Sequence, residues 1–278
     1  MPFITVGTEN SGNIDLYYED HGSGQPVVLI HGFPLDGSSW ERQIPMLLEA
    51  GYRVIHYDRR GFGKSSQPTE GYDYDTLTND LKTLLETLNL RNVILAGFSM
   101  GTGEVTHYLG SHGSERVAKA ALFAPLAPYL LETDDNPEGV PGKVFEDIKH
   151  AIRTDRFAYQ KEFLDDFFNV DVYAGTRISD QAWQGNWNVA VAASAIGTLK
   201  CVDAWLTDFR GDIAGLSSVP LLVVQGTKDR ILPIDNTGRR LPALIDGLEY
   251  HEVEEGPHNI GWTHPEILNP LFLDFVTK

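Results

Sequence analysis

Three polar side chains, far apart in the sequence, are of the types that a nucleophilic acyl transfer requires. Ser99 is the centre of a Gly-x-Ser-x-Gly pentapeptide, Asp229 follows an apolar run, and His258 lies near the C-terminus. A serine hydroxyl is a weak nucleophile at neutral pH, so it needs a base within hydrogen-bond reach and a carboxylate that orients the base. The three residues therefore predict a Ser99, His258 and Asp229 catalytic triad.

The surroundings of Ser99 match the backbone turn that exposes a serine nucleophile. A strand-like apolar run at 92–96 leads into the pentapeptide at 97–101, and a helical pattern follows at 102–109. Such an elbow needs a strand before the serine, a helix after it and small flanking residues, because the turn is strained. A glycine-rich turn that only happens to contain serine is the alternative, and the complete context favours the nucleophile.

Asp229 and His258 each have a rival in the sequence. Asp229 directly leaves an apolar strand-like run, and His258 lies in the loop after the next one. Asp235 lies farther from the end of that strand, and His264 stands at the expected start of the last helix. The order and placement favour Asp229 and His258.

The oxyanion formed by serine attack needs two backbone N–H groups that point at one position. The N–H of Met100, which follows the nucleophile, is one candidate. The loop after an early strand supplies the other, in His31-Gly32-Phe33, with Phe33 as the expected donor. An ordinary strand-to-loop turn is the alternative for these residues.

These residues need a sheet that brings the ends of distant strands together. Strand-like runs at 13–19, 26–30, 53–57, 92–96, 220–225 and 248–253 alternate with helical patterns at 40–49, 74–88 and 265–276. Such alternation predicts an α/β fold, a mostly parallel central sheet with helices on both faces. The predicted site residues follow strands, so they are expected at one edge of the sheet.

The pattern changes between the two halves of the expected sheet. We expect a core at 1–127 and 218–278, and a helical cap inserted at 128–217 with helices near 144–153, 156–168 and 179–193. The insertion holds 12 of the 29 aromatic residues. They either form the core of the cap, or some of them face a pocket below it. Among them are Phe163, Phe167, Phe168, Trp183, Trp187 and Trp205.

Composition excludes several classes of function. The 278 residues carry a formal net charge of −17, which disfavours binding to nucleic acid or to anionic lipid. The longest nearly apolar stretch, Ala120 to Leu131, is too short to span a bilayer. The N-terminus does not have the pattern of a signal peptide, so we expect a cytoplasmic protein.

Cysteine and histidine usage gives no sign of a disulfide or a metal centre. The single cysteine, Cys201, has no neighbouring histidine and is expected to be an ordinary buried thiol. No His-Glu-x-x-His motif or clustered ligand set is present in the sequence. We therefore expect no metal and no other cofactor.

Taken together, the motifs resemble the α/β-hydrolase superfamily, and within it the cofactor-free bacterial haloperoxidases, or perhydrolases, with the related arylesterases and γ-lactamases. This resemblance implies the α/β-hydrolase fold, the triad and oxyanion residues named above, no prosthetic group, a helical cap and a homo-oligomer, either a trimer or a dimer. It rests on the segments 17–20, 27–34, 57–63, 97–101, 207–210 and 262–264 and on Asp229.

Five further residues are expected around the substrate pocket: His31, Pro34, Trp205, Ile231 and Asn259. Proline at position 34 resembles relatives in which hydrogen peroxide competes with water for the acyl-enzyme, because proline restricts the backbone beside the oxyanion site. Asn259 departs from the glycine that usually follows the catalytic histidine. Asparagine tolerates a left-handed backbone, and its polar side chain is expected to alter substrate preference.

We therefore expect a serine hydrolase of small, fairly apolar esters that also performs perhydrolysis of short acids or esters. Two alternatives remain, a hydrolase of cyclic amides or lactones, and a non-catalytic oligomeric binding protein on the same scaffold. The segment 132–180 carries 12 acidic and 6 basic residues, so the cap is expected to discourage anionic substrates.

Overall fold

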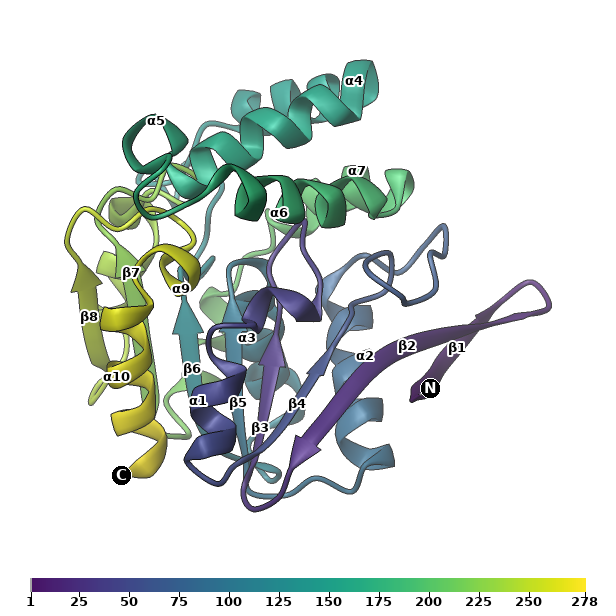
Figure 1. The fold of residues 1–278 in the computed structure, drawn as a ribbon, viewed down its shortest axis with the longest axis vertical. Coiled ribbons are helices and arrows are strands. Elements are labelled where there is room, and N and C mark those ends of the chain that lie inside the picture. The colour runs from purple at the N-terminus through teal and green to yellow at the C-terminus, as the bar shows by residue number, and fades with distance from the viewer. Residues whose placement is uncertain (1) are drawn as a thin grey trace.

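A single eight-stranded sheet runs through the molecule in the computed structural model, which describes residues 2–278 (Figure 1). Its order is β1-β2-β4-β3-β5-β6-β7-β8. The strands are β1 (Phe3–Glu9), β2 (Gly12–Gly22), β3 (Pro26–Ile30), β4 (Arg53–Tyr57), β5 (Val93–Phe98), β6 (Val117–Phe123), β7 (Leu221–Gly226) and β8 (Glu249–Val253). The β1–β2 and β2–β4 pairs are antiparallel, whereas every pair from β4 to β8 is parallel, which confirms the mostly parallel sheet.

Both faces of the sheet are buried, because its central strands carry apolar side chains at consecutive positions. On β3, Val28 and Ile30 belong to one core, and Val27 and Leu29 belong to the other. Helices α2 (Tyr74–Thr87) and α3 (Met100–His112) cover the first face, and α1 (Ile44–Glu49) and α10 (Pro265–Thr277) cover the second. This packing on two sides explains why the strands read as continuous apolar runs rather than as alternating ones.

Most predicted elements coincide with observed ones, and three differences have physical reasons. The predicted strands correspond to β2, β3, β4, β5, β7 and β8, but β1 and β6 were not predicted. β1 is half-exposed, and β6 runs without a polar break into the apolar segment after it. In place of one helix at 40–49, a 3₁₀ turn, η1 (Gly37–Trp40), precedes α1; the Asp36 carboxylate caps η1 by accepting the Ser38 N–H at 2.9 Å.

Four helices lie over the edge of the sheet at which the parallel strands end (Figure 1). They are α4 (Gly142–Phe168), α5 (Val170–Tyr173), α6 (Asp180–Ala192) and α7 (Ala195–Ala204). Helix α4 breaks at Asp155, where φ is −155°, and the Asp155 carboxylate caps the second half by accepting two N–H groups at 3.0 Å. The sequence therefore predicts the two halves of α4 correctly as separate helices.

The remaining elements are short. They are η2 (Arg210–Asp212), α8 (Ile213–Leu216), η3 (Ile234–Asn236), η4 (Gly238–Ala243) and α9 (Ile260–Thr263). Of these, η2 and α8 pack on α3, so the last residues of the predicted insertion contact the layer beside the sheet. Among residues 2–278, no helix has both the length and the apolar character that crossing a bilayer demands.

A buried ion pair joins three of the elements that surround the site. Arg59, just after β4, and Glu104, on α3, both have side chains that are only 1% exposed, and Arg59 Nε donates to Glu104 Oε1 at 2.5 Å. The Tyr57 hydroxyl donates to the other Glu104 oxygen at 2.5 Å. Arg59 also donates from Nη2 to the carbonyl of His31 at 2.7 Å and from its backbone N–H to His31 Nε2 at 2.9 Å. This network holds the loop after β3 against α3.

Glu104→Gln should leave the Arg59 guanidinium buried without a countercharge. Breaking one side of a buried pair lowers the free energy of unfolding by roughly 3–5 kcal/mol, which urea denaturation would measure. Asp147→Asn is the matched control, because it removes the exposed Lys143–Asp147 pair on α4 and should change stability little. Equal, small effects of the two substitutions would contradict the importance of the buried pair.

Candidate active site

Three predicted residues form a continuous hydrogen-bonded chain at the carboxyl edge of the sheet. Ser99 follows β5, Asp229 follows β7, and His258 lies in the loop after β8. Ser99 Oγ lies 2.8 Å from His258 Nε2, and His258 Nδ1 lies 2.8 Å from Asp229 Oδ2. With its proton on Nδ1, donated to Asp229, the imidazole leaves Nε2 free to accept the serine hydroxyl.

The backbone around Ser99 is strained and tightly packed. Ser99 has φ 52° and ψ −121°, outside the regions that residues other than glycine usually adopt. A Cβ on Gly97 would lie 2.4 Å from the Gly101 carbonyl oxygen, and a Cβ on Gly101 would lie 2.3 Å from the Ile30 carbonyl oxygen. Both flanking positions therefore require glycine, and the turn projects the serine side chain at the start of α3.

Asp229 is held in place by four hydrogen-bonding groups. Its Oδ1 accepts the backbone N–H groups of Ile231 at 2.9 Å and Leu232 at 2.8 Å. Its Oδ2, which faces His258, also accepts a hydrogen bond from Gln225 Nε2 at 3.2 Å. Gln225 was not among the predicted site residues, although it is the one amide side chain within the apolar strand β7.

The two expected oxyanion donors lie beside the nucleophile. Within residues 2–278, neither the Phe33 nor the Met100 N–H donates to a protein acceptor. Met100 is the first residue of α3, where backbone N–H groups have no partner within the helix. Gly32 brings the Phe33 loop close to the elbow, since a Cβ on Gly32 would lie 2.9 Å from the Ser99 Cβ. Both N–H groups are thus available to a bound oxyanion.

Ser99 opens into a cavity of about 310 Å³ between the sheet edge and the cap. Of the predicted site residues, Phe33, Met100, Trp205 and Ile231 also line this cavity. The remaining wall is mainly apolar and comes largely from the cap and from loops after β6 and β7; it comprises Leu126, Leu130, Val140, Val144, Phe145, Ile148, Tyr159, Phe163, Leu232 and Pro233. Three charged residues, Glu162, Asp166 and Arg230, complete the lining.

Three residues expected around the pocket do not line this cavity. The His31 ring is fully buried, accepts the Arg59 N–H at Nε2, and has its Nδ1 2.9 Å from the Gly32 carbonyl oxygen. Burial, together with the nearby Arg59 charge, lowers the pKa of His31 well below its ordinary value, so the ring is neutral. His31 therefore supports the loop that carries Phe33 and does not touch the cavity.

Pro34 and Asn259 are the other two. Pro34 is buried next to Phe33, outside the cavity wall. Asn259 has φ −88°, so its tolerance of a left-handed backbone is not used, contrary to our expectation. Instead its side chain caps α9 by accepting the Trp262 N–H at 3.0 Å, and its own N–H donates to the Phe167 carbonyl at 3.0 Å. These bonds explain how the loop accommodates asparagine after His258.

The rival residues lie outside the hydrogen-bonded chain. Asp235 pairs with Arg239 at 2.8 Å on the surface, and His264 Nδ1 lies 2.8 Å from Thr263 Oγ1 at the start of α10.

Burial raises the pKa of the Cys201 thiol to about 12, which leaves it protonated and unreactive. Among the large cap aromatics, Phe163 and Trp205 line the cavity, whereas Phe167 and Phe168 are core residues with no exposed surface.

Comparison with known proteins agrees with this architecture. A model of the α/β-hydrolase fold family matches residues 25–265. A Synechocystis protein provisionally named a non-heme chloroperoxidase is 59% identical over 276 residues, which cover 99% of this chain and 100% of that protein.

Two solved structures are also similar along nearly the whole chain. A bromoperoxidase from Bacillus anthracis has a TM-score of 0.95 at 43% identity, with 100% of this chain and 99% of that chain covered. An esterase from Exiguobacterium antarcticum has a TM-score of 0.87 at 33% identity, with 96% and 97% covered. The chain therefore belongs to the α/β-hydrolase family and, within it, to the enzymes named as non-heme haloperoxidases and esterases.

Proposed function

We propose that this enzyme is a serine carboxylesterase of small, largely apolar esters and that it also transfers the acyl group to hydrogen peroxide. The observation that carries the proposal is the hydrogen-bonded chain of Ser99, His258 and Asp229, whose serine lines a mainly apolar cavity. A non-catalytic binding role would not need a strained serine paired with a buried imidazole and carboxylate.

The geometry supports a two-step acyl transfer. Ser99 Oγ attacks the ester carbonyl carbon while His258 Nε2 takes its proton, and Asp229 stabilises the imidazolium. The N–H groups of Phe33 and Met100 stabilise the oxyanion of the tetrahedral intermediate. As this intermediate collapses, His258 gives the proton to the leaving alcohol, and the acyl group remains on Ser99. Water then attacks the acyl carbon, with His258 again as the base, and the carboxylic acid is released.

Hydrogen peroxide in place of that water would give a peracid by the same steps. The released peracid can oxidise a halide ion to hypohalous acid and is itself reduced to the carboxylic acid, so halogenation needs no metal or prosthetic group at the site. The haloperoxidase names of the similar proteins support this second activity. Pro34 supports it physically, because a proline restricts the backbone of the preceding residue, Phe33, which lines the cavity.

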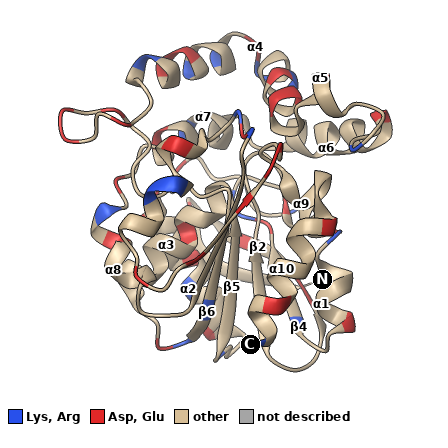
Figure 2. Cartoon of the chain, turned by 90° about the vertical axis from the view of Figure 1, so that its left-hand side faces the viewer, with Lys and Arg blue, Asp and Glu red and all other residues tan. Residues whose placement is uncertain are grey.

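The shape and charge of the cavity support neutral substrates with short apolar groups. Its volume of about 310 Å³ is at the small end of ligand pockets. Two exposed carboxylates, Glu162 and Asp166, stand at the cavity, and the Arg230 guanidinium there is paired with Asp171 at 2.7 Å. In Figure 2 further acidic positions are spread along α4 and the segment before it. An anionic substrate would therefore meet net negative charge.

Ser99→Ala should lower kcat for 4-nitrophenyl acetate by at least about 10⁴-fold, because it removes the nucleophile. The urea midpoint should stay close to that of the wild type. Ser111→Ala is the control, since Ser111 is an exposed serine near the other end of α3. Turnover by Ser99→Ala within tenfold of the wild type would rule out Ser99 as the nucleophile.

Pro34→Ala should shift the acyl-enzyme from peroxide towards water. In the proposed mechanism Pro34 holds a backbone carbonyl where it accepts a hydrogen bond from hydrogen peroxide. Loss of that bond, about 1.4 kcal/mol, corresponds to roughly a tenfold lower ratio of peracid to acid. Both products would be measured from one ester at fixed peroxide concentration, and hydrolysis without peroxide reports whether the triad is intact. An unchanged ratio with normal hydrolysis would show that Pro34 does not select peroxide.

Glu162→Gln should raise kcat/KM for an anionic ester relative to a neutral ester of equal size. The expected gain is at most about fivefold at low salt, because two unit charges 4 Å apart in water interact by about 1 kcal/mol, and it should fade as salt screens the charges. Glu86→Gln on α2 is the control for a loss of charge away from the cavity. Equal gains in both variants would exclude a local effect.

A further inference from the structure

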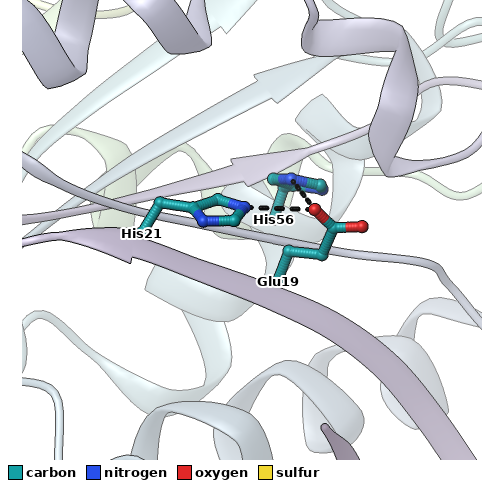
Figure 3. Close-up of side chains that lie close together, drawn as sticks. All are labelled: Glu19, His21 and His56. Carbon is teal, nitrogen blue, oxygen red and sulfur yellow. Dashed lines mark hydrogen bonds and ion pairs between the residues drawn. The ribbon is translucent and has the colours of Figure 1, made fainter. Parts of the chain in front are cut away.

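Two histidines and a glutamate meet on the antiparallel edge of the sheet, among residues that neither line the cavity nor belong to the triad. Glu19 and His21 lie on β2, and His56 lies directly opposite Glu19 on β4. Residues two apart on a strand, and residues opposite each other in register, share one face of a sheet. Figure 3 shows the result: both imidazole rings approach the same carboxylate oxygen.

We propose that Glu19, His21 and His56 form a binding site for one divalent transition-metal ion of the Zn²⁺ type. Glu19 Oε2 lies 3.1 Å from His21 Nε2 and 3.6 Å from His56 Nε2, and the three ligand atoms all lie within 4.8 Å of one another. Ligand atoms about 2.0–2.1 Å from a tetrahedral zinc ion are about 3.3 Å apart. The printed separations of 3.1 Å and 3.6 Å are close to that value, and the exposed His21 ring can move to complete the geometry.

The carboxylate is already oriented with one oxygen towards the histidines. Its other oxygen, Oε1, accepts the Tyr17 hydroxyl at 2.7 Å and lies 3.7 Å from Lys64 Nζ. Metal-binding carboxylates are commonly held in this way by hydrogen bonds from outside the coordination shell. The Lys64 ammonium opposes a nearby cation, but this side chain is 62% exposed and contacts the oxygen that faces away from the histidines.

The environment also favours one class of ion and an open coordination position. The His56 side chain is 7% exposed, and the Gly37 backbone packs closely against its ring. A Cβ on Gly37 would lie only 2.6 Å from His56 Nδ1. His21 is 46% exposed at its side chain, so water can complete a tetrahedral shell on that side. Two imidazole nitrogens and one carboxylate suit Zn²⁺, Ni²⁺ or Cu²⁺, whereas Ca²⁺ and Mg²⁺ prefer shells of oxygen ligands.

A bound ion would link β2 to β4 across the strand pair that joins the N-terminal hairpin to the rest of the sheet. The cluster is not visible in the sequence, because 34 residues separate His21 from His56. Their proximity depends on the antiparallel register of β2 and β4, which the residues alone did not reveal.

The test is uptake of Zn²⁺ by protein that has been stripped with a chelator, measured by equilibrium dialysis and by the shift of the thermal unfolding midpoint. We expect one ion per chain and a higher midpoint, because the ion binds the folded state. His21→Ala should weaken binding by at least about tenfold. Glu19→Gln should do the same while it keeps the size of the side chain and an acceptor for Tyr17.

His251→Ala is the matched control. On β8, His251 Nε2 lies 3.1 Å from Glu249 Oε1, the same distance as between His21 and Glu19. Among the described residues, however, this pair belongs to no group of three ligands. This variant should bind Zn²⁺ like the wild type. Ester hydrolysis checks that every variant is folded. The proposal is overturned if the wild type takes up no ion, or if His21→Ala and Glu19→Gln bind Zn²⁺ as tightly as His251→Ala.

Discussion

The buried pair of Arg59 and Glu104 connects the parts of the molecule that have to be placed together for the proposed acyl transfer. Glu104 belongs to α3, which begins directly after Ser99, and Arg59 bonds the ring and carbonyl of His31 in the loop that carries Phe33. The two proposed oxyanion donors come from this loop and from the first residue of α3. Their relative position therefore depends on a charged contact from which water is excluded, where removal of either partner leaves an uncompensated charge.

The three residues of the proposed triad lie at the same edge of the sheet, and other contacts hold them in place. The strained turn at Ser99 is possible because Gly97 and Gly101 allow neighbouring backbone to approach closely. Asp229 is fixed by two backbone N–H groups and by Gln225, so its carboxylate can orient His258 without moving. Each proposed reacting group thus follows a strand of the sheet, while the cap supplies most of the apolar wall of the cavity. Because the cavity wall and the proposed triad come from different segments, substrate preference can vary while the triad stays in place.

Local sequence patterns predicted what depends on local chemistry. The elbow, the order of serine, aspartate and histidine, and most strands follow from periodicity and turn residues, as does the break of α4 near Asp155. The roles of Gln225, His31 and Asn259 could not be predicted in this way, because each depends on partners from distant segments. The cluster of Glu19, His21 and His56 is missed for the same reason, since only strand register brings its members together. Isolated polar residues in apolar or loop segments were the only available signal.

The central claim is that Ser99 carries the acyl group, and covalent labelling tests it most directly. The enzyme would be treated with a fluorophosphonate ester, and its intact mass would be measured before and after reaction. Peptide mapping would then locate the label. We expect one phosphonyl group per chain, attached to Ser99, with loss of ester hydrolysis in step with labelling. A folded protein that takes up no label, or that is labelled at another residue while hydrolysis stops, would contradict it.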